Sequence, residues 1–198
     1  SIHPKERYMD RFHHLREEAR NTLYDIHRVA SPLGKPTQDI RDRMARTFAF
    51  NRSRDGSAMN YEYHLGFNVH TMLTCADETV EGVYRYMIEE ATECDEQSRE
   101  GRAYRKRMTK AYEAFIGSHF KWSYNRRFLR TDKGSFGWGV NGVKAGDKVV
   151  VFLGCDYPFT LRAQDNGQYI IIGDCYIDQF MDGEAISEDV KTECFTII

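Results

Sequence analysis

The C-terminal third of the chain constrains the fold most, because its apolar residues alternate with a period of two. From Arg126 to Ile198, short β-branched and aromatic runs are separated by Gly, Asp and Asn. This pattern is typical of short antiparallel strands joined by tight turns. A small antiparallel β-barrel of the SH3-like kind is therefore expected over residues 121–198. Its predicted strands span 126–131, 135–140, 148–154, 159–163, 169–177 and 194–198.

Residues 1–120 have apolar residues at three- and four-residue intervals instead, which predicts a helical region. Residues 61–73 also alternate like a strand, but their neighbours favour a helix. The fold class is therefore α+β, with a helical region over 1–120 followed by the β module over 121–198. Whether the two parts share one core stays open. Helices are predicted over 4–30, 37–48, 61–73, 78–93 and 98–117.

Several short motifs in the β module form a recognisable set. Together with a weaker match at Arg46-Thr47-Phe48, they resemble the C-terminal region of fungal heterokaryon-incompatibility (HET) domain proteins. About seventy residues carry this resemblance. The motifs are Arg126-Arg127-Phe128, Thr131 with Gly134, Gly137 with Gly139, Gly146-Asp147, the run from Gly154 to Arg162 with Pro158, Gly173-Asp174-Cys175-Tyr176, and Met181-Asp182-Gly183-Glu184.

The resemblance implies a binding role for this chain. In that family the N-terminal HET domain carries the cell-death activity and contains a Tyr/Leu-Ser-Tyr-x-Trp-Gly type motif. Here only Trp138 is followed by Gly, and no such motif occurs. We therefore expect a non-catalytic recognition or regulatory module, either cut from a longer protein or a natural short relative. The implied role is in non-self recognition and programmed cell death, with a HET domain in cis or another protein as the partner.

The composition indicates which partners and which cellular compartment to expect. The formal net charge of -2 gives no overall attraction to nucleic acid or to an anionic membrane, and no apolar run approaches membrane-spanning length. The five cysteines are odd in number and widely spaced, with no Cys-x-x-Cys pair, which argues against a disulfide scaffold and a zinc site. Reduced thiols and a cytoplasmic location are expected. The cysteines are Cys75, Cys94, Cys155, Cys175 and Cys194.

Residues 137–142 form a literal Gly-x-Gly-x-x-Gly. A dinucleotide site needs a helix directly after such a loop, whereas residues 143–147 read as a turn. The glycines are therefore predicted to permit bends and close strand approach, and no cofactor is expected.

No catalytic or metal-binding set stands out. There is no Gly-x-Ser-x-Gly motif, and all seven histidines precede the β module. His13-His14 reads as part of a helix surface, and the acidic residues 174–184 read mainly as strand-end and turn positions. We therefore expect no enzyme activity and no metal.

A basic segment supports an alternative function. Residues 99–130 contain ten Lys and Arg against two Glu, interleaved with aromatic residues. A nucleic-acid or anion-binding protein could use this segment. A free-standing fungal effector is a third possibility. The candidate binding surface is Arg105, Lys106, Arg107, Arg126, Arg127, Arg130 and Trp138.

Overall fold

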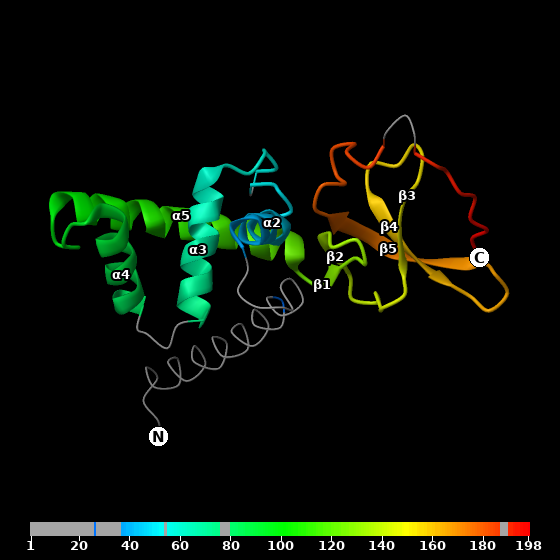
Figure 1. The fold of residues 1–198 in the computed structure, drawn as a ribbon, viewed down its shortest axis with the longest axis horizontal. Coiled ribbons are helices and arrows are strands. Elements are labelled where there is room, and N and C mark those ends of the chain that lie inside the picture. Colours follow the sequence, from blue (N-terminus) through cyan, green and yellow to red (C-terminus); the bar gives the residue numbers. More distant parts are fainter. Residues whose placement is uncertain (1–25, 27–36, 54, 76–79, 187–189) are drawn as a thin grey trace, which may run out of the picture. The chain divides into compact units, whose positions relative to one another are not determined.

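The chain folds as α+β, with helices followed by strands, as the sequence predicts (Figure 1). The computed structural model describes residues 26, 37–53, 55–75, 80–186 and 190–198. The helix predicted over 4–30 lies outside these residues except for Ile26, which is buried. The described elements are helices α2 (Gln38–Phe48), α3 (Tyr61–Cys75), α4 (Val80–Thr92) and α5 (Arg99–Ser123), and strands β1 (Arg126–Arg130), β2 (Phe136–Val140), β3 (Lys148–Val151), β4 (Pro158–Ala163) and β5 (Tyr169–Ile177).

The helices follow local sequence signals. Thr37 caps α2, because its Oγ1 accepts a hydrogen bond from the Ile40 amide at 3.3 Å. The ambiguous stretch 61–73 lies within a helix, α3. Helix α5 continues past Gly117 to Ser123, further than expected, because one glycine weakens a long apolar face without ending it.

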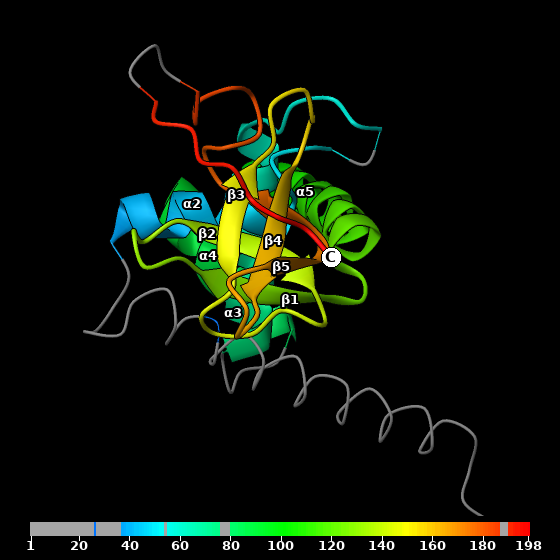
Figure 2. The same ribbon diagram turned by 90° about the vertical axis from the view of Figure 1, so that its right-hand side faces the viewer.

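The five strands form one antiparallel sheet with the order β1-β2-β5-β4-β3 (Figure 1). Strand β5 is central, and it pairs with different neighbours in its two halves. Its second half pairs with β2, with Trp138 opposite Tyr176, and its first half pairs with β4, with Arg162 opposite Ile170. Figure 2 shows β3, β4 and β5 beside one another, as the register requires. A β-bulge lies between Thr160 and Leu161, where the pairing shifts along β5.

Two predictions about the sheet need correction. The strand expected over 148–154 ends at Val151, because a turn closes from the Cys155 amide to the Phe152 carbonyl at 3.0 Å. The stretch 194–198 makes only an isolated bridge, between Ile197 and Tyr169. Strands β1 and β3 are the sheet edges and do not pair with each other among the described strands, so an SH3-like closed barrel is not confirmed.

The chain divides into two compact units, and the division differs from the predicted boundary near 120. One unit contains residues 59–118 of the described chain, and the other contains 37–58 and 119–198. Helix α2 therefore belongs with the sheet, although three helices follow it in sequence before β1. We call the first the helical unit and the second the sheet unit.

The helical unit has its own apolar core, contributed by three helices. Gly66 of α3 lies against the Ala111 carbonyl of α5, where a Cβ would find no room. Glu62 and Arg107 join the same two helices through paired hydrogen bonds of 3.0 and 2.8 Å. The buried core residues are Leu65, Val69, Met87, Ile88, Met108 and Ala111.

In the sheet unit, a buried carboxylate holds α2 on the sheet. Asp178, just after β5, is 2% exposed and accepts hydrogen bonds from Arg46 at 3.1 and 3.2 Å and from Arg43 at 3.4 Å. Arg43 also donates to the Gly134 carbonyl at 2.9 Å and lies over the Phe136 ring. We call Asp178, Arg43 and Arg46 the Asp178 cluster. Because a buried charge is tolerated only when it is paired, the cluster specifies where α2 packs.

Aromatic rings fill the space between α2 and the sheet. The Trp138 indole donates to the Thr47 carbonyl at 2.9 Å, and its ring meets the Phe48 and Phe128 rings edge-on. His119 stacks on Phe48 at 5.0 Å between centroids. Burial lowers the pKa of His119, which keeps this ring neutral in the core. The core of the sheet unit is therefore aromatic and depends on α2.

The Gly-x-Gly-x-x-Gly motif is structural, as predicted. No helix follows Gly142: the Val143 amide bonds back to the Val140 carbonyl at 3.0 Å and closes a turn. Gly137 lies so close to the Tyr176 carbonyl of β5 that a Cβ would collide with it. A Cβ on Gly139 would lie 2.6 Å from a Val143 methyl group. The glycines thus permit close packing of strands.

We predict that Gly137→Ala destabilises the protein by about 1–3 kcal/mol, because the added methyl group overpacks a backbone contact. Gly142→Ala is the matched control, since its Cβ would make an ordinary contact of 3.4 Å with Ile172. Urea unfolding of both variants measures the difference. Equal stability of the two variants would contradict the close approach of β2 and β5.

We also predict that Asp178→Asn lowers the free energy of unfolding by about 2–3 kcal/mol, because two arginines lose a buried counter-charge. Asp182→Asn is the control, since its ion pair with Arg52 is solvent-exposed and such pairs contribute about 0–1 kcal/mol. Chemical denaturation followed by tryptophan fluorescence reports both changes. A loss at Asp182 as large as that at Asp178 would argue against the cluster's role.

Candidate protein-binding site

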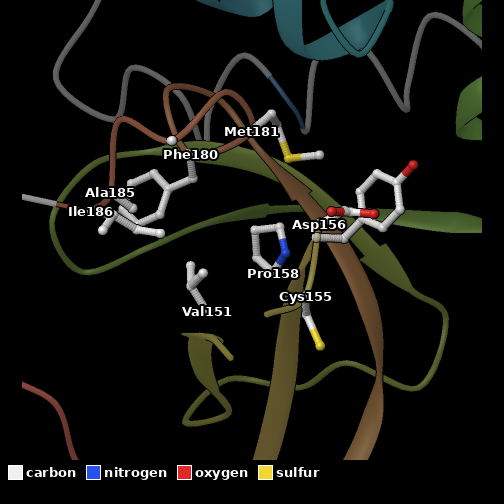
Figure 3. A pocket seen from close by; sticks show the side chains of 10 residues that line it. Val151, Cys155, Asp156, Pro158, Phe180, Met181, Ala185 and Ile186 are labelled. Atoms are coloured by element: carbon white, nitrogen blue, oxygen red, sulfur yellow. The ribbon is translucent and has the colours of Figure 1, made fainter. Parts of the chain in front are cut away.

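A hollow of about 260 Å³ opens in the sheet unit beside the ends of β3 and β4. We call it the apolar hollow because most of the side chains that line it are apolar, although polar groups also reach its surface. Its walls come from Val151 and Pro158 at the strand ends, from residues 155–157 between them, and from the segment 180–186 after β5. Figure 3 shows Phe180, Ala185 and Ile186 facing the strand ends.

The turn between β3 and β4 forms one wall because it cannot continue as strand. Gly154 has a φ of +87°, a conformation that glycine adopts without strain, and the turn carries the chain away from the sheet. It exposes large apolar side chains, with Leu153 75% and Tyr157 58% exposed. Of these two side chains, Tyr157 lines the hollow.

The segment after β5 forms the opposite wall and is held by polar contacts. The Phe180 amide donates to the Ile177 carbonyl at 3.1 Å, which turns the chain at the end of β5. Arg52 of the loop after α2 reaches Asp182 at 2.8 Å. The Ile186 amide then donates to the Gly183 carbonyl at 3.0 Å, and the Ile186 side chain is 55% exposed. Apolar groups therefore border the hollow on both sides.

The chemistry of the lining favours binding. Among its residues only Cys155, Asp156 and Tyr157 carry ionisable side chains, and no histidine or lysine lies with them. A thiol or hydroxyl nucleophile usually needs an adjacent base, and the Asp156 carboxylate is the one candidate base among the lining side chains. The volume is also below the roughly 300 Å³ at which small-molecule sites begin. One inserted apolar side chain suits the space better than a whole ligand.

The candidate basic residues fall in both units. Arg105, Lys106 and Arg107 belong to the helical unit, where Arg105 pairs with Glu96 at 3.5 Å and Arg107 pairs with Glu62 at 2.8 Å. These carboxylates reduce the positive charge that a phosphate would meet. Lys106 is exposed.

The other candidates belong to the sheet unit, and two of them bond to neighbouring groups. Arg126 forms an ion pair with Asp174 at 2.5 Å, and Arg127 donates to the Val143 carbonyl at 3.2 Å. Arg130 is exposed. The prediction that Trp138 lies on a binding surface is wrong, because its side chain is 6% exposed and packs in the aromatic core.

The acidic residues near the end of β5 serve the fold. Asp174 and Asp182 each pair with one arginine, and Asp178 pairs with two. No group of three or more His, Cys, Asp or Glu among the described residues could hold a metal ion. His13 and His14 lie outside the described part of the chain.

The hollow was not predicted from the sequence. Its two walls nevertheless coincide with two runs that carry the family resemblance, Gly154 to Arg162 and Met181 to Glu184. These runs are far apart in sequence, and neither has a catalytic pattern. Only the return of the chain after β5 brings them together.

The structure is that of an α+β protein with a small hollow in its β module. The family model described as the Het-6 beta-barrel domain matches residues 34–197, and the chain belongs to this family. The match confirms the resemblance to a HET-associated region, and the HET domain itself is not detected.

One curated relative supports the same assignment. The chain is 35% identical over 76 residues to heterokaryon incompatibility protein 6, OR allele, of Neurospora crassa. This stretch covers 37% of the chain and 11% of the Neurospora protein. No solved structure matches the chain. Within the described residues, no helix has the length and apolarity that a membrane crossing requires.

The cysteines offer a test of the hollow's exposure. Cys155 lines the hollow and is exposed, whereas Cys175 of β5 is 2% exposed and burial raises its pKa to about 12. Because the thiolate is the reactive form, we predict that iodoacetamide modifies Cys155 of the folded protein and leaves Cys175 intact until unfolding. Mass spectrometry of the digested protein measures both sites, with Cys155→Ser as the control. Equal rates for the two thiols would refute the placement of Cys155.

Proposed function

We propose that this chain is a non-catalytic recognition module of a fungal heterokaryon-incompatibility-like protein. It binds a protein segment, supplied by a HET domain in cis or by a second protein, at the apolar hollow. Through this contact it contributes to non-self recognition that leads to programmed cell death. Membership of the Het-6 beta-barrel domain family supports the link to heterokaryon incompatibility, and the hollow supports the binding role.

One observation carries the proposal: mostly apolar side chains line a small hollow, and two of them, Tyr157 and Ile186, are exposed. Leu153 and Tyr157 project from the turn before β4, and Ile186 borders the hollow on the opposite wall. Protein interfaces commonly place an aromatic or aliphatic anchor in such a depression, surrounded by a rim that excludes water. The neighbouring Asp156 can orient a partner by hydrogen bonding.

The surrounding fold suits the hollow to recognition. Its walls end at β3, β4 and β5, which are held in one hydrogen-bonded sheet, so the strand ends keep their spacing. The walls themselves are turns, where side chains can differ between relatives without altering the sheet. Variable walls on a constant sheet are what discrimination between self and non-self requires.

We predict that Tyr157→Ala weakens binding of a separately expressed HET domain by about tenfold or more, as truncation of an interface hot spot does. Tyr124→Ala is the matched control, because Tyr124 is 83% exposed and does not line the hollow. Isothermal titration calorimetry with the HET domain of the chain's own full-length protein, or of the Neurospora relative, measures both affinities.

A cellular experiment tests the biological role. Replacing both Tyr157 and Ile186 by Asp in the full-length protein should suppress cell death after fusion of incompatible strains, while protein abundance stays unchanged. Unaltered death in that strain, with the double variant shown to be folded, would exclude the hollow as the recognition surface.

A further inference from the structure

The walls of the apolar hollow carry charge of one sign. The two wall segments, residues 151–158 and 180–186, contain three acidic residues and no lysine or arginine. The acidic residues are Asp156, Asp182 and Glu184, and all three are exposed. Carboxylates at the surface of a depression attract cationic groups and repel anionic ones. A positively charged partner is therefore favoured at the hollow.

One of these carboxylates already has a cationic partner. Asp182 pairs with the Arg52 guanidinium at 2.8 Å, within the sheet unit. The Glu184 carboxylate accepts a hydrogen bond from the Asp182 amide at 2.7 Å, which shapes the turn but leaves the charge of Glu184 in place. The three wall carboxylates thus have one guanidinium among the described ion pairs, so a negative charge remains on the walls.

Asp156 is the acidic residue that lines the hollow itself. It lies in the turn between β3 and β4, and among the residues that the structure describes its carboxylate forms no hydrogen bond or ion pair. A carboxylate without such partners can accept charge-assisted hydrogen bonds without first breaking others. Asp156 is therefore available to a cationic side chain of a partner.

The apolar and acidic parts of the lining lie at different ends of the hollow. Figure 3 shows Asp156 on one side of Pro158 and Phe180 on the other. Ala185 and Ile186 lie beside Phe180. The hollow therefore has an apolar end at the segment after β5 and an acidic end at the turn before β4. A segment that fills both ends needs an apolar side chain and a cationic side chain close together.

We propose that the partner segment carries an arginine next to the apolar side chain that enters the hollow, and that the guanidinium binds the Asp156 carboxylate. This inference rests on the proposed function, since it names the chemistry of the segment bound at the same site. Arginine can donate two parallel hydrogen bonds to a carboxylate, which fixes the direction in which the segment crosses the hollow. Tyr157, the next residue, is 58% exposed and offers a ring face to the guanidinium.

Arginine suits this site better than other charged groups. A lysine ammonium is a compact, strongly hydrated charge, and it neither pairs with a carboxylate through two parallel bonds nor stacks on a ring as a plane. A phosphate or an acidic side chain is repelled by the carboxylates of the walls. The hollow is thus unsuited to nucleic acid, and a basic protein segment is the occupant that its charge complements.

The test uses an array of short synthetic peptides. In each peptide a central Leu, Phe or Tyr is flanked by Arg, Lys, Gln or Glu, in a background of Gly and Ser. Binding of the purified chain is measured at low salt, and fluorescence anisotropy gives affinities for the best peptides. Peptides with Arg should bind about tenfold more tightly than those with Gln, as expected for a charge-assisted hydrogen bond. Peptides with Glu should bind most weakly.

Charge reversal at Asp156 tests the assignment directly. Asp156→Asn should remove the difference between the Arg and Gln peptides, and Asp156→Arg should make the Glu peptides bind most tightly. Asp165→Arg is the matched control, because Asp165 is exposed and does not line the hollow, while its substitution changes the net charge equally. This control should keep the preference for arginine. Urea unfolding verifies that each variant is folded.

Three results would overturn the inference. They are equal binding of the Arg and Gln peptides by the parent chain, a preference for arginine that persists in folded Asp156→Arg, and a dimer of the chain alone that Asp156→Arg abolishes. The last result would assign the hollow to a second copy of the chain.

The variant Tyr157→Ala distinguishes failure of the inference from failure of the proposed function. Peptide binding that this variant weakens, without a preference for arginine, would contradict the inference and leave the proposed function standing. An absence of binding to every peptide would contradict both.

Discussion

The buried carboxylate of Asp178 is the interaction on which the sheet unit depends. It lies where β5 ends and receives two arginines from α2, a helix more than a hundred residues earlier in the chain. A buried charge is costly unless it is paired, so the helix has one favourable position on the sheet. That position brings Phe48 onto Trp138 and delivers Arg52 to Asp182, beside the hollow. The core and one wall of the candidate site thus follow from the same ion pairs.

Strand β5 leads the chain from the sheet into the candidate site. Its C-terminal end leads through Asp178 into the segment 180–186, which forms one wall of the hollow. Its N-terminal half is left without β2, because β2 pairs only with the last residues of the strand. This nine-residue strand therefore pairs with β4 over its first part and with β2 over its last residues, and the C-terminal segment bridges to Tyr169 at its start.

Much of the secondary structure could be predicted because it depends on local signals. Five strands and the described helices follow apolar periodicity, and the Asp165-Asn166-Gly167 turn between β4 and β5 has residues that favour a hairpin. The glycines 137–142 were also interpreted correctly, since the absence of a following helix can be read from the residues. The segment 194–198 was predicted as a strand and forms one bridge, because pairing depends on a neighbour that a local pattern does not reveal.

The candidate site was less predictable for the same reason. Trp138 looked suitable for a surface because tryptophan is common at interfaces, but packing against α2 buries it. The sequence by itself determined the element types, the turn positions and the family, all of which are recorded in short runs of residues. Only the tertiary structure decided that α2 joins the sheet, which arginines are neutralised, and where apolar side chains meet around a hollow. Those outcomes depend on contacts between residues far apart in the chain, which periodicity and composition do not encode.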